Sequence, residues 1–330
     1  MAPRIWLETT GQDGKGFPAF FRAYKHFLTA GNSELAYART YFNANTIEYS
    51  VSQAGYDVED SSFTPAQHSE YISDIARVVS LARGMGFVVI LSVNDASPLS
   101  GNTNRYASYP DDSTARVNVA LGRTYGGDRE IMLEVTSESW PADQRASTAD
   151  LWRQYIDGGS GREGDAEVGI NDILRDIRST GAKNVLLVQP FFSKGWAGYP
   201  NTIVDPLGQL AFAVHPYMVF TGTTRGQWDA YFGRFARNHP TVVTEWHENA
   251  GPLGNLRYDW CTGQSTIDLP RQKLAYFDEV GIDGVVGWAW DVPGTLLDGF
   301  EGKATRQVNC GAPSNDVGEL LKSHFGAGSQ

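Results

Sequence analysis

Short apolar runs alternate with amphipathic stretches along the whole chain. The runs are apolar at nearly every position, which is typical of strands buried on both faces of a parallel sheet. Eight of them predict strands, at residues 4–9, 35–42, 87–94, 130–137, 184–192, 212–218, 241–246 and 284–290.

Helical spacing of apolar residues fills most of the intervals. The clearest start is Thr64 to Gln67, where a Thr cap, a Pro at the first helical position and a Gln at the third open a helix. Ile72, Ile75 and Val79 then follow at helical spacing. Between the fifth and sixth strands no helix is recognisable. Further helices are predicted at about 17–30, 113–124, 148–179 with a Gly-rich interruption, 225–238, 269–280 and 315–325.

Eight buried strands that alternate with helices predict an α/β fold, a single (β/α)8 TIM barrel over residues 1–330 with extended βα loops. A doubly wound open sheet is the alternative. The chain lacks the phosphate-binding patterns GxGxxG and GxxxxGK[ST], so nucleotide-binding versions of that sheet are not favoured.

Composition narrows the classes of partner. The 330 residues are 41% apolar and carry a net charge of −11, which opposes binding to nucleic acid or to an anionic membrane. No window approaches the roughly 18 apolar residues of a membrane span, and the start, MAPRIWLETTG, lacks the regions of a signal peptide. We expect a monomer with a neutral partner, and neither nucleic acid nor membrane.

Polar and aromatic residues close several predicted strands. In a barrel of this kind the chemistry lies at the carboxyl ends of the strands. The residues at these ends are Arg39, Asn94, Glu138, His215, Tyr217, Glu245, Trp288 and Trp290.

Two of these residues are acids on opposite sides of the predicted barrel. Glu138 ends the fourth strand and Glu245 the seventh, so they can face each other over a substrate. A retaining glycosidase uses two carboxyl groups about 5 to 5.5 Å apart. One strand-end Glu alone is more often a surface residue, and it is the combination that favours a site. Glu134 lies lower on the same face as Glu138, and we expect Arg39 to pair with it.

Other chemistries find less support in the sequence. Only six His residues occur and none forms HxH or HExxH, while a Ser nucleophile lacks its GxSxG turn. We therefore expect neither a metal nor a cofactor. The two cysteines, Cys261 and Cys310, could form one disulfide or remain two free thiols.

At these positions the chain resembles the retaining β-glycosidases of clan A, and most closely glycoside hydrolase family 5, which includes many cellulases and β-mannanases. The family's fourth-strand pattern E-x-x-N-E-P is similar to Glu134 through Ser139. Its sixth-strand H-x-Y resembles His215 to Tyr217, and its seventh-strand acid resembles Glu245 in TEW.

The resemblance implies roles for these residues. Glu138 would be the acid/base and Glu245 the nucleophile, with Tyr217 hydrogen-bonded to the nucleophile and His215 lining the sugar site. Arg39 would take the place of the family's second-strand arginine, and Glu48 in NTIEYS is a competing alignment for that place.

Aromatic side chains are expected to extend the cleft, because sugar faces stack on rings. By resemblance Trp290 would be the platform under the sugar, with Trp288 one layer lower. The candidates in loops are Trp140, Phe192, Trp196, Tyr199 and Trp246.

The implied activity is an endo-acting, cellulase-like β-1,4-glucanase on a neutral polysaccharide or oligosaccharide, working by double displacement. A β-mannanase, another β-glycosidase or a transglycosylase of the same clan is an alternative. Two departures, Ser137 for the family's Asn and Asn94 for its third-strand His, motivate a rival from another class, a noncatalytic glycan-binding barrel. The resemblance also implies secretion, which a Cys261–Cys310 disulfide between two cleft loops would suit.

Overall fold

The computed structural model of the protein describes most of the chain. The described residues are 4–7, 34–61, 63–94, 109–139, 146–160, 166–190, 194–246, 268–282, 284–288, 307–309, 312–315 and 317–327.

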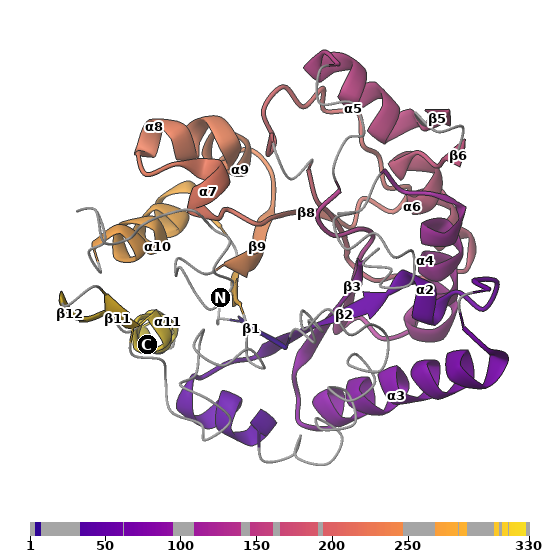
Figure 1. Ribbon diagram of the computed structural model, residues 1–330, viewed down its shortest axis with the longest axis horizontal. Coiled ribbons are helices and arrows are strands. Elements are labelled where there is room, and N and C mark those ends of the chain that lie inside the picture. The colour runs from indigo at the N-terminus through magenta and orange to yellow at the C-terminus, as the bar shows by residue number, and fades with distance from the viewer. Residues whose placement is uncertain are drawn as a thin grey trace.

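Eight parallel strands close into a barrel, and helices surround it (Figure 1). Each strand pairs in parallel with its two neighbours, and the first strand closes the ring by pairing with both the second and the last. The predicted (β/α)8 barrel is confirmed. In order around the ring the strands are β1 (Arg4–Leu7), β2 (Thr46–Ser52), β3 (Val88–Asn94), β4 (Ile131–Glu134), β7 (Leu186–Val188), β8 (Leu210–Val214), β9 (Thr241–Trp246) and β10 (Gly284–Gly287).

The helices follow the strands along the chain. Two small antiparallel pairs, β5 (Gly159–Ser160) with β6 (Ala166–Glu167) and β11 (Gln307–Asn309) with β12 (Ala312–Asn315), lie outside the barrel. The helices are α2 (Gln53–Tyr56), α3 (Pro65–Gly84), α4 (Asp112–Tyr125), α5 (Thr148–Asp157), α6 (Ile170–Ser179), α7 (Met218–Thr221), α8 (Arg225–Trp228), the π-helical turn η1 (Asp229–Gly233), α9 (Arg234–Ala236), α10 (Asp268–Val280) and α11 (Val317–Ala327).

Local sequence accounts for several of these boundaries. At the start of α3 the Gln67 amide N–H donates to the Thr64 hydroxyl (3.3 Å) and the Thr64 N–H donates to Gln67 Oε1 (2.8 Å), which is the predicted capping box. The Gly-rich interruption of the predicted helix 148–179 falls where α5 ends, at Gly158 with φ 75°. That conformation is open to glycine and costly for other residues.

The strand predicted at 35–42 is wrong. Residues 34–41 are helical, and the second strand is β2. Leu35, Ala38 and Phe42 are buried at helical spacing, and the rings of Tyr37 and Tyr41, four residues apart, stack at 4.7 Å. The apolar content of this run was read as a strand although its burial follows the period of a helix.

The remaining helix predictions divide into three cases. The predicted helices at 113–124, 225–238, 269–280 and 315–325 correspond to α4, to α8 with η1 and α9, to α10 and to α11. Among the described residues 194–209, which connect β7 to β8, no helix forms. The helix predicted at 17–30 lies outside the described residues.

Two apolar clusters form the core. The larger lies between the strands and the helices. The smaller is contributed by successive strands and fills the barrel interior, with the members Ile90, Leu187, Ala211, Ala213, Val242, Val286 and Trp288.

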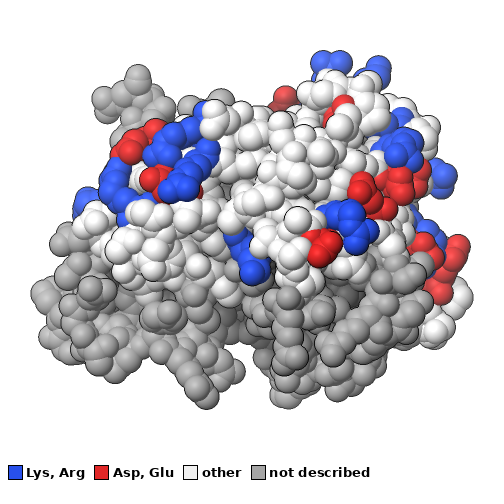
Figure 2. Space-filling model, turned by 90° about the horizontal axis from the view of Figure 1, so that it is seen from above, with Lys and Arg blue, Asp and Glu red and all other residues white. Residues whose placement is uncertain are grey.

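The surface carries charges of both signs. On the face in Figure 2, Lys and Arg lie in mixed groups with Asp and Glu, separated by broad areas without charge. Surface ion pairs include that of Arg175 with Asp172 (2.7 Å). Within the described part of the chain, no helix has both the length and the apolar character needed to cross a membrane.

Candidate active site

A layer of buried polar side chains lies directly above the apolar filling of the barrel. Because side chains alternate along a strand, the residue two positions after an inward apolar residue also points inward. Ile90 and Leu187 of the interior cluster are followed in this way by Ser92 and Gln189. The buried polar residues of the layer are Glu48, Ser92, Glu134, Gln189, His215 and Thr244.

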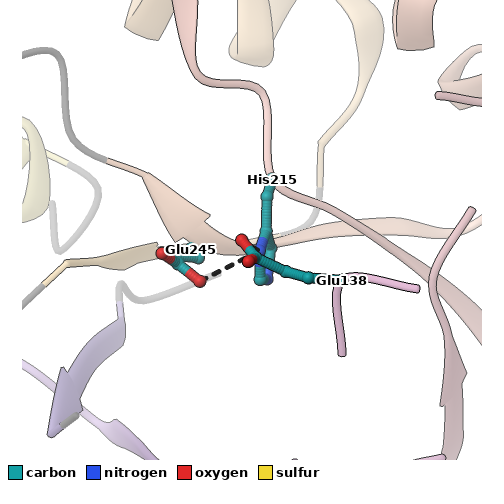
Figure 3. Close-up of side chains that lie close together, drawn as sticks. All are labelled: Glu138, His215 and Glu245. Atoms are coloured by element: carbon teal, nitrogen blue, oxygen red, sulfur yellow. Dashed lines mark hydrogen bonds and ion pairs between the residues drawn. The ribbon is translucent and has the colours of Figure 1, made fainter. Parts of the chain in front are cut away.

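His215 of this layer meets two carboxylates, Glu138 and Glu245 (Figure 3). Nδ1 of His215 lies 2.9 Å from Oε1 of Glu138 and 2.9 Å from Oε2 of Glu245. The three ligand atoms all lie within 4.8 Å of one another. The Glu138 side chain is 20% exposed and that of Glu245 9%, while His215 is fully covered. The strand-end residues predicted from the sequence are therefore brought together.

These three residues are also close enough to share one cation. Among the described residues no other group of three or more acidic, His or Cys side chains has this geometry.

Tyr217 holds the second oxygen of Glu245. Its hydroxyl donates a hydrogen bond to Glu245 Oε1. Tyr217 caps the start of α7, two residues beyond His215. Glu245 is therefore fixed from two sides, by a phenol at one oxygen and an imidazole at the other.

Burial and the neighbouring charges together raise the pKa values of both Glu245 and His215. Burial, followed by the repulsion of Glu138, raises the pKa of Glu245 to about 7 although His215 and Tyr217 act to lower it. Burial alone would lower the pKa of His215, but the carboxylates of Glu245 and Glu138 outweigh it and raise that pKa.

Gln189 connects the polar layer to the carboxylates, and sequence reasoning missed it. Its Nε2 lies 2.5 Å from Glu134 Oε1 and 2.7 Å from His215 Nε2, and its Oε1 accepts the backbone N–H of Glu138 at 2.9 Å. Thr244 also donates to Glu134 Oε1 (3.1 Å). A signal was present, because Gln189 follows the apolar run NVLLV at the carboxyl end of a buried strand.

Arg39 does not belong to the site, and its predicted pairing with Glu134 is wrong. It lies on the helix over residues 34–41, where its guanidinium donates to the Gly86 carbonyl (3.2 Å) and lies 5.3 Å from the ring of Phe87. Gly86 and Phe87 precede β3, so Arg39 is at the amino end of the strands, opposite the carboxylates.

The competing alignment, Glu48, falls on β2 and inside the barrel. Its side chain is fully buried, and neither carboxyl oxygen has a hydrogen-bond partner among the described residues. Burial, and then the nearby carboxylates of Glu134 and Glu245, raise the pKa of Glu48 well above its ordinary value. Glu48 is thus, with Glu134, one of two buried acids beneath the facing pair.

The two residues that depart from the family pattern border the site. Asn94 is half-buried at the end of β3, in register with Ser52 of β2. Ser137 is buried, and its backbone N–H donates to the Val93 carbonyl (2.8 Å), which ties the segment after β4 to β3.

The described aromatic candidates are mainly packing residues. Trp288 lies in the interior cluster, as expected for a layer below the site. Trp196 and Trp246 are buried, and the Trp196 ring stacks on Phe235 at 4.3 Å, so neither is a cleft platform. The half-buried Tyr199 packs edge-on against Trp196 at 5.2 Å. Trp140, Phe192, Trp290, Cys261 and Cys310 lie outside the described residues.

A (β/α)8 barrel that presents two carboxylates from its fourth and seventh strands has the architecture of a glycosidase. The family model described as Cellulase (glycosyl hydrolase family 5) matches residues 10–292, and the chain belongs to this family. It is therefore a glycoside hydrolase and not the noncatalytic barrel considered above. A comparison with curated protein sequences finds no match.

Solved structures of similar fold include the following three. A beta-glucanase from Saccharophagus degradans has a TM-score of 0.66 and 13% identity, with 100% of this chain and 88% of that chain covered. Endocellulase from Pyrococcus horikoshii, in complex with cellotetraose, has a TM-score of 0.62 and 11% identity, with 98% of this chain and 92% of that chain covered. Cel5A (EG2) from Hypocrea jecorina has a TM-score of 0.59 and 14% identity, with 98% of this chain and 97% of that chain covered. At these identities the likeness establishes the fold.

Proposed function

We propose that the protein is a retaining, endo-acting β-1,4-glucanase with Glu245 as nucleophile and Glu138 as acid/base. The separation of the two carboxylates carries the proposal, since their facing oxygens lie within 4.8 Å. Inverting enzymes hold these groups about 6.5 to 9.5 Å apart to admit a water, whereas retaining enzymes hold them about 5 to 5.5 Å apart. The short separation favours direct attack on the sugar.

The surroundings of each carboxylate support the division of roles. Glu245 is nearly buried and held at both oxygens by Tyr217 and His215, as suits a nucleophile that must approach one carbon in a fixed orientation. Glu138 is more exposed, which suits a group that gives its proton to the leaving oxygen and later activates water.

The chemical sequence follows from these positions. Ionised Glu245 attacks the anomeric carbon, and the bond to the leaving oxygen breaks as Glu138 transfers its proton to that oxygen. Glu138, now ionised, takes a proton from water, whose oxygen attacks the same carbon and releases Glu245. Each carboxyl ends in the state in which it began.

A β-1,4-glucan is the proposed substrate because similar folds were solved with its fragments, including a beta-glucanase from Saccharophagus degradans in complex with cellotetraose. The protein's net charge of −11 is compatible with an uncharged polysaccharide substrate. Secretion and a monomeric state, both expected from the sequence, belong to the same proposal. A β-mannanase remains the alternative within the family.

The test is release of reducing ends from a panel of β-glucans, mannans and xylans, with wild type beside Glu245→Gln. We expect one β-glucan to be cut and the variant to be inactive. Retention is read from the anomer formed first, by proton NMR. An active Glu245→Gln variant would remove Glu245 from its role, and cleavage of mannan alone would select the alternative substrate. Transfer products without hydrolysis would identify a transglycosylase.

The acid/base assignment is tested with Glu138→Gln on two kinds of substrate. A glucoside with a good leaving group needs no proton for the first step, so its glycosyl-enzyme should still form, while polysaccharide cleavage should fall by about 10²- to 10⁴-fold. Equal losses on both substrates would contradict the role of Glu138.

A further inference from the structure

Gln189 contacts the buried acid Glu134, the histidine between the facing carboxylates and the backbone of Glu138. Thr244 shares the first two of these contacts. Gln189 follows β7 directly, is 1% exposed, and its own backbone carbonyl accepts the Tyr155 hydroxyl from α5 (2.7 Å). Its amide oxygen accepts from the Glu138 backbone, and its amide nitrogen lies close to Glu134 and His215 and, at 3.5 Å, to the Thr244 hydroxyl. No role for Gln189 was implied by the motifs of the sequence.

The orientation of the Gln189 amide is fixed by the backbone of Glu138. An N–H can only donate, so the atom 2.9 Å from the Glu138 nitrogen must be the amide oxygen. The amide nitrogen then faces Glu134 Oε1 and His215 Nε2, and its two hydrogens suffice for one bond to each. The reverse orientation would set two donors against each other at Glu138.

The same hydrogen bond supports an unusual backbone conformation. Glu138 has φ 54°, in the left-handed region that residues other than glycine seldom adopt. Such conformations cost about 1 to 3 kcal/mol and persist where the surroundings enforce them. Gln189 therefore helps to aim the Glu138 side chain.

An N–H donor pointed at His215 Nε2 decides which ring nitrogen holds the proton. Nε2 has to offer its lone pair to Gln189, so the ring proton must lie on Nδ1, where it faces Glu138 and Glu245. We propose that Gln189 is a positioning residue that keeps His215 neutral, with its proton on Nδ1, between the two carboxylates. This inference rests on the function proposed above.

The surrounding charges would otherwise favour a cationic ring. Glu138 and Glu245 contact Nδ1, the ionised form of Glu134 interacts with the ring from below, and Tyr217 lies edge-on at 6.4 Å. The hydroxyl of Thr244, 3.2 Å from Nε2, could accept a second ring proton. Gln189 opposes that proton because its own N–H occupies the direction of the Nε2 lone pair.

A neutral ring matters for the chemistry. A cation between two carboxylates favours the ionised form of both, and that is the wrong state for the group that must donate a proton to the leaving oxygen. A neutral Nδ1–H donates to the carboxylates without adding a full charge. It also leaves Nδ1 without a lone pair for a metal, although the three ligand atoms are close enough to share one.

The direct test is the tautomer of His215 in the full chain, by ¹⁵N NMR of protein labelled at histidine. The His215 signals are assigned as those missing from His215→Asn. At neutral pH we expect one nitrogen of the protonated type, Nδ1, and one of the unprotonated type, Nε2. Two protonated-type nitrogens, or a proton on Nε2, would overturn the proposal whether or not the protein cleaves glucan.

The second test is Gln189→Glu, which keeps the shape and the acceptor for the Glu138 N–H but replaces the donor at His215. We expect both ring nitrogens to become protonated, and kcat on polysaccharide to fall by about 10²-fold with little change in KM. A substrate with a good leaving group should lose less. The matched control Gln272→Glu, on the exposed face of α10, should change neither the protonation of His215 nor kcat. A His215 ring that keeps the same protonation in Gln189→Glu as in the wild type would contradict the proposal.

Discussion

The carboxyl of Glu48 on β2 lies against the carboxyl of Glu134 on β4, both fully buried inside the barrel. Two buried acids in contact cannot both ionise at low cost. Glu134 accepts hydrogen bonds from Gln189 and Thr244, which stabilise its ionised form. Neither oxygen of Glu48 has a hydrogen-bond partner of good geometry among the described residues. The nearby Ser92 hydroxyl lowers the pKa of Glu48 less than burial and the neighbouring acids raise it, so Glu48 is the member that keeps a proton.

Glu48→Gln is expected to stabilise the protein at neutral and alkaline pH. Burial, then Glu134 and Glu245, raise the pKa of Glu48. The folded state thus binds this proton more tightly than the unfolded state, whose glutamate pKa is about 4.3. Stability should fall as pH rises from there through the folded pKa, by at most about 1.4 kcal/mol per unit. Thermal unfolding across pH should show this decline in wild type and a flatter curve in the variant.

The control for that experiment is Glu130→Gln, because Glu130 is exposed. Its unfolding curve should follow the wild type. If Glu48→Gln also follows the wild type at every pH, Glu48 does not hold a proton in the folded state.

Tyr217→Phe is expected to move the acidic limb of the pH–activity curve to higher pH. Glu245 must be ionised to act as the proposed nucleophile, so kcat/KM should rise through its pKa, which is raised to about 7 mainly by burial. Tyr217 lowers that pKa through its hydrogen bond. A bond to a charged group contributes about 1.5 to 3 kcal/mol, so its loss should shift the limb by about one to two pH units. A limb that stays in place would show that another group controls it.

Lys273 on α10 is expected to hold the segment that carries His215 and Tyr217. Its buried ammonium donates to the Pro216 carbonyl (2.5 Å) and to the Thr221 hydroxyl (2.8 Å). Lys273→Met leaves both acceptors without this donor, at about 1 to 3 kcal/mol for each. The melting temperature and kcat/KM should both fall, whereas Lys183→Met, at an exposed position, should change neither. A variant with normal kinetics would show that the segment holds its shape without Lys273.

Trp196→Ala is expected to damage stability and not substrate binding. Trp196 is 3% exposed, stacks on Phe235, and donates from its indole to the Ala213 carbonyl (3.1 Å). Removing a buried aromatic ring costs about 3 to 5 kcal/mol. The unfolding midpoint should drop while KM for the polysaccharide is unchanged at a temperature where the variant is folded. A raised KM with a normal midpoint would restore the platform role predicted from the sequence.

The barrel was predictable because seven of the eight strands are short runs with no helical alternative. The exception shows the limit of that reasoning. Residues 35–42 and 46–52 are both rich in apolar and aromatic side chains, and only the burial of Leu35, Ala38 and Phe42 on one helical face separates them. The polar Glu48 and Ser50 made the true strand look less buried than it is.

The residues that meet at the carboxylates were predictable from their place at strand ends, as with Glu138, His215 and Glu245. Gln189 and Thr244 in the layer beneath them were missed. A place at the end of an apolar run is only a weak signal for a glutamine or threonine, and the contacts of these two residues depend on the barrel closing. The prediction for Arg39 was wrong because the strand predicted at 35–42 was wrong. A wrongly assigned element places its side chains at the wrong end of the barrel.

The left-handed backbone of Glu138 has a consequence for directed evolution of this enzyme. Glycine adopts that conformation without strain, so a screen that rewards heat resistance alone would be drawn to substitutions at position 138. Those survivors would be the variants that had lost the proposed proton donor. Selection for robustness and selection for turnover therefore conflict at one residue, and a library for this chain should hold position 138 constant.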